Sequence, residues 1–105
     1  MTAKAIANIL ASWMRTVEDA LESYAEDLKY WERIRERKEA STYHLAGCTS
    51  VYRTRITIAR DHFKIEALEI LKETILEAIN DAEELADEPE AFFYLLEFIK
   101  ETYTK

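Results

Sequence analysis

An apolar residue recurs at every third or fourth position from Ala3 to Ile34, and no Gly or Pro interrupts the series. This spacing places the side chains on one face of an α-helix. Because the repeat is close to a heptad, the stripe suits a long antiparallel partner helix. We predict a helix over residues 3–39 with Thr2 as its N-cap. The stripe consists of Ala3, Ile6, Leu10, Trp13, Val17, Leu21, Tyr24, Leu28, Trp31 and Ile34.

The rest of the chain is equally poor in turn-forming residues. Its 105 residues include one Gly and one Pro, whereas a β-sandwich or barrel needs a turn about every 8–12 residues. Ala, Leu, Glu, Lys and Arg, which are good helix formers, dominate the composition. The chain is also too short for a second hydrophobic core. We therefore predict an all-α fold in which residues 1–105 form a single helical domain.

A polar segment over residues 40–50, ASTYHLAGCTS, follows the first helix. Gly47 can adopt the left-handed conformation that reverses the chain, and Thr49 or Ser50 can cap the helix that follows. We predict a turn here and a second helix over residues 51–86. Two apolar rows on that helix indicate burial on more than one side. The first row is Tyr52, Ile56, Ala59, Phe63, Ala67, Ile70, Thr74 and Ala78, and the second is Ile58, Ile65, Leu68, Leu71, Ile75, Leu76 and Ile79.

A third helix is predicted over residues 89–103, because Pro89 suits the first helical turn. It covers only one half of the antiparallel hairpin that the two longer helices form. In the other half, two helices leave many apolar side chains exposed, which marks an interface. We expect a two-fold homodimer with a dimeric helical bundle as its core, or docking of another protein. The side chains concerned are Tyr24, Leu28, Trp31, Ile34, Tyr52, Ile56, Ile58, Phe63 and Ile65.

Charge divides the chain into a basic and an acidic part. Residues 29–64, called the basic tip, carry nine Lys or Arg and four acids, whereas the remainder, the acidic body, carries five bases and 17 acids. Aromatic residues lie among the bases of the tip, and such a surface suits an acidic partner. We predict a non-enzymatic binding or regulatory protein that acts through protein–protein contact. The predicted binding residues are Trp31, Arg35, Tyr52, Arg55 and His62.

Other interpretations of the charge pattern remain open. Bases and acids that alternate at helical spacing are typical of an ordinary solvated face. Lys and Arg interleaved with aromatic residues also suit local contact with nucleic acid, although the net charge of −7 opposes general binding to a polyanion. Conversely, the acidic body could imitate nucleic acid and inhibit a nucleic-acid-binding protein, as small acidic inhibitors from phages and mobile elements do.

Arg55 and His62 are separated by six residues, which places both on one face of a helix. This R-x6-H spacing resembles, at its long limit, the motif of the HEPN ribonuclease superfamily, whose members are all-α and often dimeric. The resemblance implies that His62 acts as acid or base and that Arg55 stabilises a phosphate. Ile56 departs from the family, which often has a polar residue directly after the Arg.

Glu66 and Glu69 are followed by Glu84 and Asp87, so that an acid-x-x-acid pattern occurs twice. The pattern resembles the carboxylates with which all-α NTP pyrophosphatases hold Mg²⁺ from two helices. The resemblance implies a magnesium-dependent hydrolase with these four residues as ligands. On one continuous helix, the two pairs would meet only across a dimer or where the helix breaks.

His44 and Cys48 have a spacing that can chelate zinc, but a structural zinc site needs four ligands. We therefore expect no metal and no cofactor. A lone Cys fits a reducing compartment, and the N-terminus lacks the continuous apolar region of a signal peptide. No run approaches the ~20 apolar residues of a membrane span. The expected location is the cytoplasm, with no membrane partner.

Overall fold

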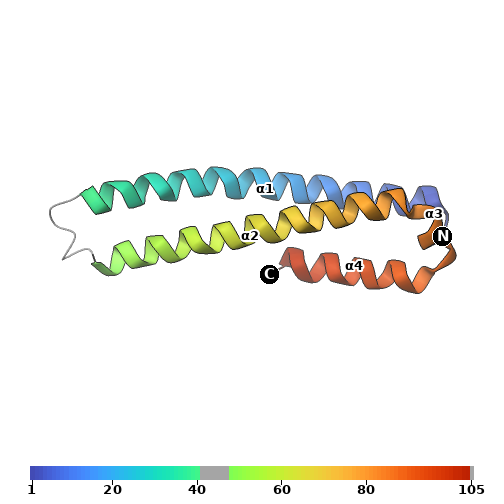
Figure 1. Cartoon of the computed structure of the whole chain (residues 1–105). Helices are drawn as coiled ribbons and strands as arrows, with labels where there is room; N and C mark the ends of the chain where they lie inside the picture. Colours follow the sequence, from blue (N-terminus) through green and yellow to red (C-terminus); the bar gives the residue numbers. More distant parts are fainter. Residues whose placement is uncertain (41–47, 105) are drawn as a thin grey trace. The chain divides into compact units, whose positions relative to one another are not determined.

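The computed structural model describes residues 1–40 and 48–104, with side chains over 1–38 and 52–103. These residues form four helices and no strand (Figure 1). The first two helices are antiparallel and a shorter helix follows, which confirms the prediction of an all-α hairpin with a short C-terminal helix. The helices are α1 (Ala3–Ala40), α2 (Cys48–Asn80), α3 (Ala82–Asp87) and α4 (Pro89–Thr104).

Thr2 caps α1 as predicted. Its Oγ1 accepts a hydrogen bond from the backbone N–H of Ala5 at 3.2 Å, and its carbonyl oxygen accepts one from the N–H of Ile6 at 3.1 Å. The first bond satisfies an N–H group that has no partner within the first helical turn, and the second is the first regular hydrogen bond of the helix. At the other end of α1, Arg37 and Lys38 lie in the last turn, where cations interact favourably with the helix dipole.

The predicted helix over residues 51–86 is wrong at both ends. α2 begins at Cys48, so Thr49 and Ser50 lie within the helix instead of capping it. α2 ends at Asn80, and Asp81 has φ −95° and ψ 15° before the short α3 begins. Asn and Asp are weaker helix formers than the residues around them, so a break at this pair costs little helix propensity.

The end of α3 and the start of α4 follow the expected chemistry. The backbone N–H of Glu88 donates to the carbonyl oxygens of Glu84 and Leu85 at 3.1 and 3.2 Å, which closes the last turn of α3. Pro89 then occupies the first position of α4, where its missing N–H costs no helical hydrogen bond.

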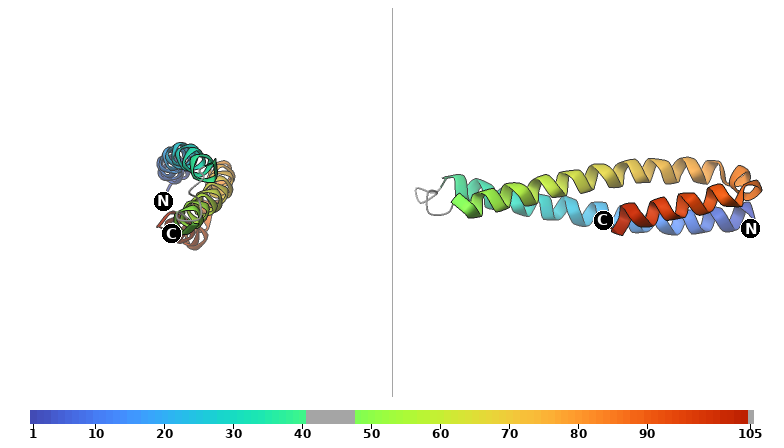
Figure 2. Two further views of the ribbon diagram at one scale, coloured as in Figure 1. Left: turned by 90° about the vertical axis from the view of Figure 1, so that its left-hand side faces the viewer. Right: turned by 90° about the horizontal axis from the view of Figure 1, so that it is seen from below.

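The chain forms two compact units, and unit 1 consists of Met1–Leu21 and Ala67–Lys105. In this unit α4 runs back beside the segments of α1 and α2 (Figure 1, Figure 2). Tyr103 of α4 meets Trp13 of α1 edge to face, with ring centroids 6.1 Å apart. Complete burial of a Val, Leu, Ile, Phe or Met side chain contributes about 1.5–3 kcal/mol. The buried apolar residues are Ile6, Leu10, Met14, Val17, Leu68, Leu71, Ile75, Ala78, Ala82, Phe92 and Ile99.

Unit 2 consists of Glu22–Glu66, in which antiparallel segments of α1 and α2 form the helical part. Among its described side chains, only Thr54, Ile58 and Asp61 are buried. Two helices bury only the single seam where they meet, so the expected exposure of apolar residues in this half is confirmed. The remaining apolar residues that face the seam are half-buried: Tyr24, Leu28, Trp31, Ile34 and Ile65.

Candidate functional site

The α2 segment of unit 2 has two opposite faces. Its buried residues, Thr54, Ile58 and Asp61, follow a step of four and a step of three. On the other side, four residues with steps of four, three and four form a second line, called the outer row: Tyr52, Ile56, Ala59 and Phe63.

The outer row is open to solvent. Tyr52 is 58% exposed, Ile56 51% and Phe63 75%. The prediction that the second helix is buried on more than one side is therefore wrong in unit 2, because the unit has only one helix to set against α2. The row is a contiguous apolar surface on a helix whose opposite face already packs against α1.

Three arginines and a histidine, all exposed, flank the outer row. At about 100° per residue, Arg53 and Arg60 fall on one side of the row, and Arg55 and His62 fall on the other; all four are exposed. The guanidinium carbon of Arg55 lies 5.9 Å from the centroid of the Tyr52 ring, a cation–π contact. Asp61 is the one acid among residues 52–65, and it is buried. The exposed charge beside the row is therefore positive until Glu66.

The buried side of unit 2 is unusually polar. The Nζ of Lys38 on α1 donates a hydrogen bond to the Oγ1 of Thr54 on α2 at 2.9 Å. This bond ties the two helices together and provides an acceptor for a half-buried ammonium group. Sequence reasoning missed Thr54, although the signal was present: Thr54, Ile58 and Asp61 continue at steps of four and three into Ile65 and Leu68.

Asp61 occupies a core position of the seam and is only 6% exposed. Its carboxyl group shares a hydrogen bond with that of Asp27 on α1. Burial raises the pKa of Asp61 from 3.8 to about 6; Asp27 adds to the rise, and the charge of His62 opposes it. Among the described residues, no group hydrogen-bonds the buried Oδ2 of Asp61. Two acids that meet at a helix–helix seam destabilise unit 2 near neutral pH.

The structure distributes the five predicted binding residues over two surfaces. Tyr52 and Arg55 are exposed on α2 and contact each other. His62 is also exposed, and its Nε2 lies 3.9 Å from the Oε1 of Glu32 on α1.

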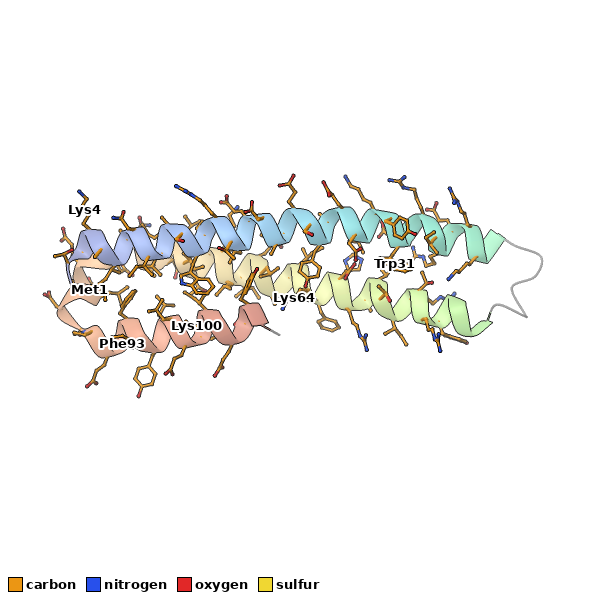
Figure 3. All side chains as sticks on the ribbon, turned by 180° about the vertical axis from the view of Figure 1, so that it is seen from behind. Met1, Lys4, Trp31, Lys64, Phe93 and Lys100 are labelled. Atoms are coloured by element: carbon orange, nitrogen blue, oxygen red, sulfur yellow. The ribbon has the colours of Figure 1, made fainter. Side chains whose placement is uncertain are left out.

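The other two predicted binding residues, Trp31 and Arg35, lie on α1 and are half-buried. The Trp31 ring meets that of Tyr30 edge to face at 5.3 Å between centroids. Figure 3 labels Trp31 on α1 and Lys64 on α2 of this unit. Ile56, Phe63 and the two arginines at 53 and 60 were not among the predicted binding residues, yet they complete the exposed surface of α2.

The residues that suggested metal sites are not assembled into one. Over residues 1–40 and 48–104, no group of three or more His, Cys, Asp or Glu lies close enough to hold a metal ion. Glu84 and Asp87 lie on α3, which the break at Asp81 separates from the helix of Glu66 and Glu69. His44 and the side chain of Cys48 lie outside the described residues.

No helix in the described part of the chain combines the length and apolar character needed to cross a membrane. Comparisons with protein-family models, curated proteins and solved structures found no match to this chain. The function is therefore inferred from the chemistry of its own surfaces.

Proposed function

We propose that this chain is a non-enzymatic binding protein and that the outer row of unit 2 docks an amphipathic helix with acidic side chains from another protein molecule. The observation that carries the proposal is the outer row itself, with three large apolar side chains exposed and only cations beside them up to Glu66. A folded protein gains nothing from leaving such a row in water, and contiguous exposed apolar patches mark interaction sites.

The residues at this surface are of the kind that contribute most to protein interfaces. Aromatic side chains and Arg are enriched among interface residues with large effects on affinity. Complete burial of an Ile or Phe side chain contributes about 1.5–3 kcal/mol, and association has to offset several kcal/mol of lost translational and rotational freedom. Tyr52, Ile56 and Phe63 together supply a gain of that order. The spacing i, i+4, i+7, i+11 fits a partner helix packed along α2.

The flanking charges select an acidic protein as the partner. Arg53 and Arg60 on one side and Arg55 on the other attract carboxylates at the rim of a contact, which increases the association rate and rejects basic partners. Nucleic acid fits less well, because the two aromatic rings of the outer row are separated by aliphatic side chains. They therefore do not form adjacent surfaces on which successive bases could stack. In addition, unit 1 carries 13 acids and five bases, which repel a polyanion.

Photocrosslinking from the outer row tests the proposal. p-Benzoyl-phenylalanine replaces Phe63 in the full chain expressed in its native host cells, and Glu26, exposed on α1 of the same unit, serves as the control position. We expect an adduct from position 63 and none from position 26. Mass spectrometry of the crosslinked peptide should identify an amphipathic helix with acidic residues.

A matched variant makes the test specific. In the presence of Arg53→Glu and Arg60→Glu, the crosslink from position 63 should be lost while the circular dichroism of the protein stays unchanged, because both arginines are exposed. Absence of any adduct specific to position 63, or an adduct that survives both charge reversals, would overturn the proposal.

A further inference from the structure

Asp61 is the one buried ionisable side chain in the described part of unit 2, and the docking surface proposed above does not use it. It is 6% exposed, and no group in the described part of the chain hydrogen-bonds its Oδ2. A buried carboxylate that lacks hydrogen bonds is costly when ionised and far less so when protonated. The stability of the seam between α1 and α2 in unit 2 therefore depends on the protonation of this one group.

The group that α1 sets against Asp61 opposes its ionisation. Asp27 of α1 shares a hydrogen bond with the Asp61 carboxyl group, and its negative charge adds to the effect of burial. An ionised carboxylate is an acceptor only, so this hydrogen bond exists only while one of the two groups keeps a proton. Loss of that proton replaces a hydrogen bond across the seam with repulsion between the two helices.

The other charged groups near Asp61 do not offset this repulsion. His62 adjoins Asp61 on α2 and opposes the rise in its pKa, but the imidazole is exposed, with its Nε2 3.9 Å from the Oε1 of Glu32 on α1. Lys64, three residues along α2, is half-buried. The pKa of Asp61 is nevertheless raised to about 6, so burial and Asp27 outweigh the cations.

Unit 2 has little apolar burial with which to hold the seam closed. Ile58 is the one buried apolar side chain among its described residues, whereas all the other buried apolar side chains of the described chain belong to unit 1. Proteins open locally where few apolar contacts are buried. A single ionisation can therefore shift the opening equilibrium of unit 2 without unfolding unit 1.

We propose that unit 2 is a proton-controlled hairpin, in which a protonated Asp61 keeps the seam between α1 and α2 closed and an ionised Asp61 opens it while unit 1 stays folded. Because the pKa of Asp61 is raised in the closed form, closure is favoured at low pH and this advantage is lost as the pH rises through about 6. The inference is independent of the partner at the outer row, because Asp61 lies on the opposite side of α2.

Amide hydrogen exchange of the full chain tests the inference. Mass spectrometry resolves the exchange into peptides from each unit, at about pH 5 and about pH 8, and the intrinsic pH dependence of exchange is corrected for. The helical segments of unit 2 should open about tenfold more often at the higher pH, which is the factor that pKa values of 3.8 and about 6 give over this range. Exchange of the helices in unit 1 should not change.

Four variants assign the effect to Asp61. Asp61→Asn cannot ionise and should abolish the pH dependence, and Asp27→Asn, at an exposed position, should reduce it. Glu66→Gln, at an exposed acid of the same unit, is the matched control and should behave like wild type. His62→Gln should also keep the pH dependence, although histidine changes charge in the same pH range.

Several results would overturn the inference. Unit 2 of wild type could open equally often at both pH values, or unit 1 could open with it to the same extent, which would indicate global unfolding. Persistence of the tenfold change in Asp61→Asn, or its loss in His62→Gln, would assign the effect to another group. None of these results bears on the crosslink from position 63, so the proposed function stands or falls separately.

Discussion

Replacing Asp61 with Asn removes the carboxyl group that unit 2 buries next to Asp27 while it preserves the size of the side chain. Asp61 is 6% exposed, and its pKa in the folded protein is about 6 against an ordinary 3.8. Because the folded pKa is raised, the carboxyl group favours folding when protonated. Its contribution is complete below pH 3.8 and is lost as the pH rises through about 6.

The size of the effect follows from the shift. One pKa unit corresponds to about 1.4 kcal/mol, so a rise from 3.8 to about 6 means that ionised Asp61 costs unit 2 about 3 kcal/mol at neutral pH. Asn carries no charge, and its amide can donate a hydrogen bond to the Asp27 carboxylate. We therefore expect Asp61→Asn to raise the free energy of unfolding by about 1–3 kcal/mol near pH 8, and by close to nothing near pH 4.

Urea denaturation, followed by circular dichroism, measures the free energy of unfolding at about pH 8 and about pH 4. The dependence of that free energy on urea concentration should be the same in both proteins, because a difference would indicate a change in the unfolded state. Glu66→Gln, at an exposed acid of the same helix, is the control and should change little at either pH. Because the charge of His62 lowers the pKa of Asp61, the comparison is repeated in a His62→Gln background, which removes that interaction.

Two results would refute this reasoning. A gain of equal size at both pH values would mean that Asn improves packing or hydrogen bonding irrespective of charge. A loss of stability near pH 8 would mean that the ionised carboxylate of Asp61 is favourable where it lies. Asp27→Asn provides an independent check, because it removes the neighbouring charge and should lower the pKa of Asp61 towards 3.8.

Three further predictions concern the core, the seam and the charged rims. Leu71→Ala, in the core of unit 1, should lower the free energy of unfolding by about 2–5 kcal/mol. Phe63→Ala, at an exposed position, should change it by less than about 0.5 kcal/mol. Chemical denaturation of both variants checks this contrast. Thr54→Val removes one hydrogen-bond acceptor of the Lys38 ammonium group and should cost about 1 kcal/mol in the same assay. An unchanged stability would contradict a structural role for that bond. Arg60→Glu should weaken the binding of an acidic partner to the outer row, as measured by the yield of the crosslink from position 63. An unchanged yield argues against a role of the cations beside the row.

Much of the fold could be predicted because its signals are local. Thr2 caps α1, and Pro89 opens α4, because each acts through the backbone of its own helical turn. The break at Asp81 was harder to place, since a single Asn-Asp pair lowers helix propensity by only tenths of a kcal/mol per residue. The predicted helix over residues 51–86 therefore continued through a position where α2 ends.

The candidate site could be predicted only in part. The polarised charge and the surplus of apolar residues in the two-helix half were evident from composition and spacing. The selected residues on α1, Trp31 and Arg35, are half-buried, whereas Ile56 and Phe63 proved to be exposed in the centre of the outer row. Helical periodicity identifies which side chains share a face, but it does not tell which face another helix covers.

By itself, the sequence determined that this chain is helical, where α1 and α4 begin, and that one half of the hairpin has more apolar surface than two helices can bury. Those properties depend on residues within one or two helical turns of each other and on the number of apolar residues in each half of the hairpin. Only the tertiary structure decided which side of α2 in unit 2 faces α1. Two sides of α2 could have packed against α1. The outer row is the more apolar of the two, yet the side with Thr54 and Asp61 is the buried one. That choice depends on groups contributed by the other helix, because Lys38 of α1 donates a hydrogen bond to Thr54 across the seam.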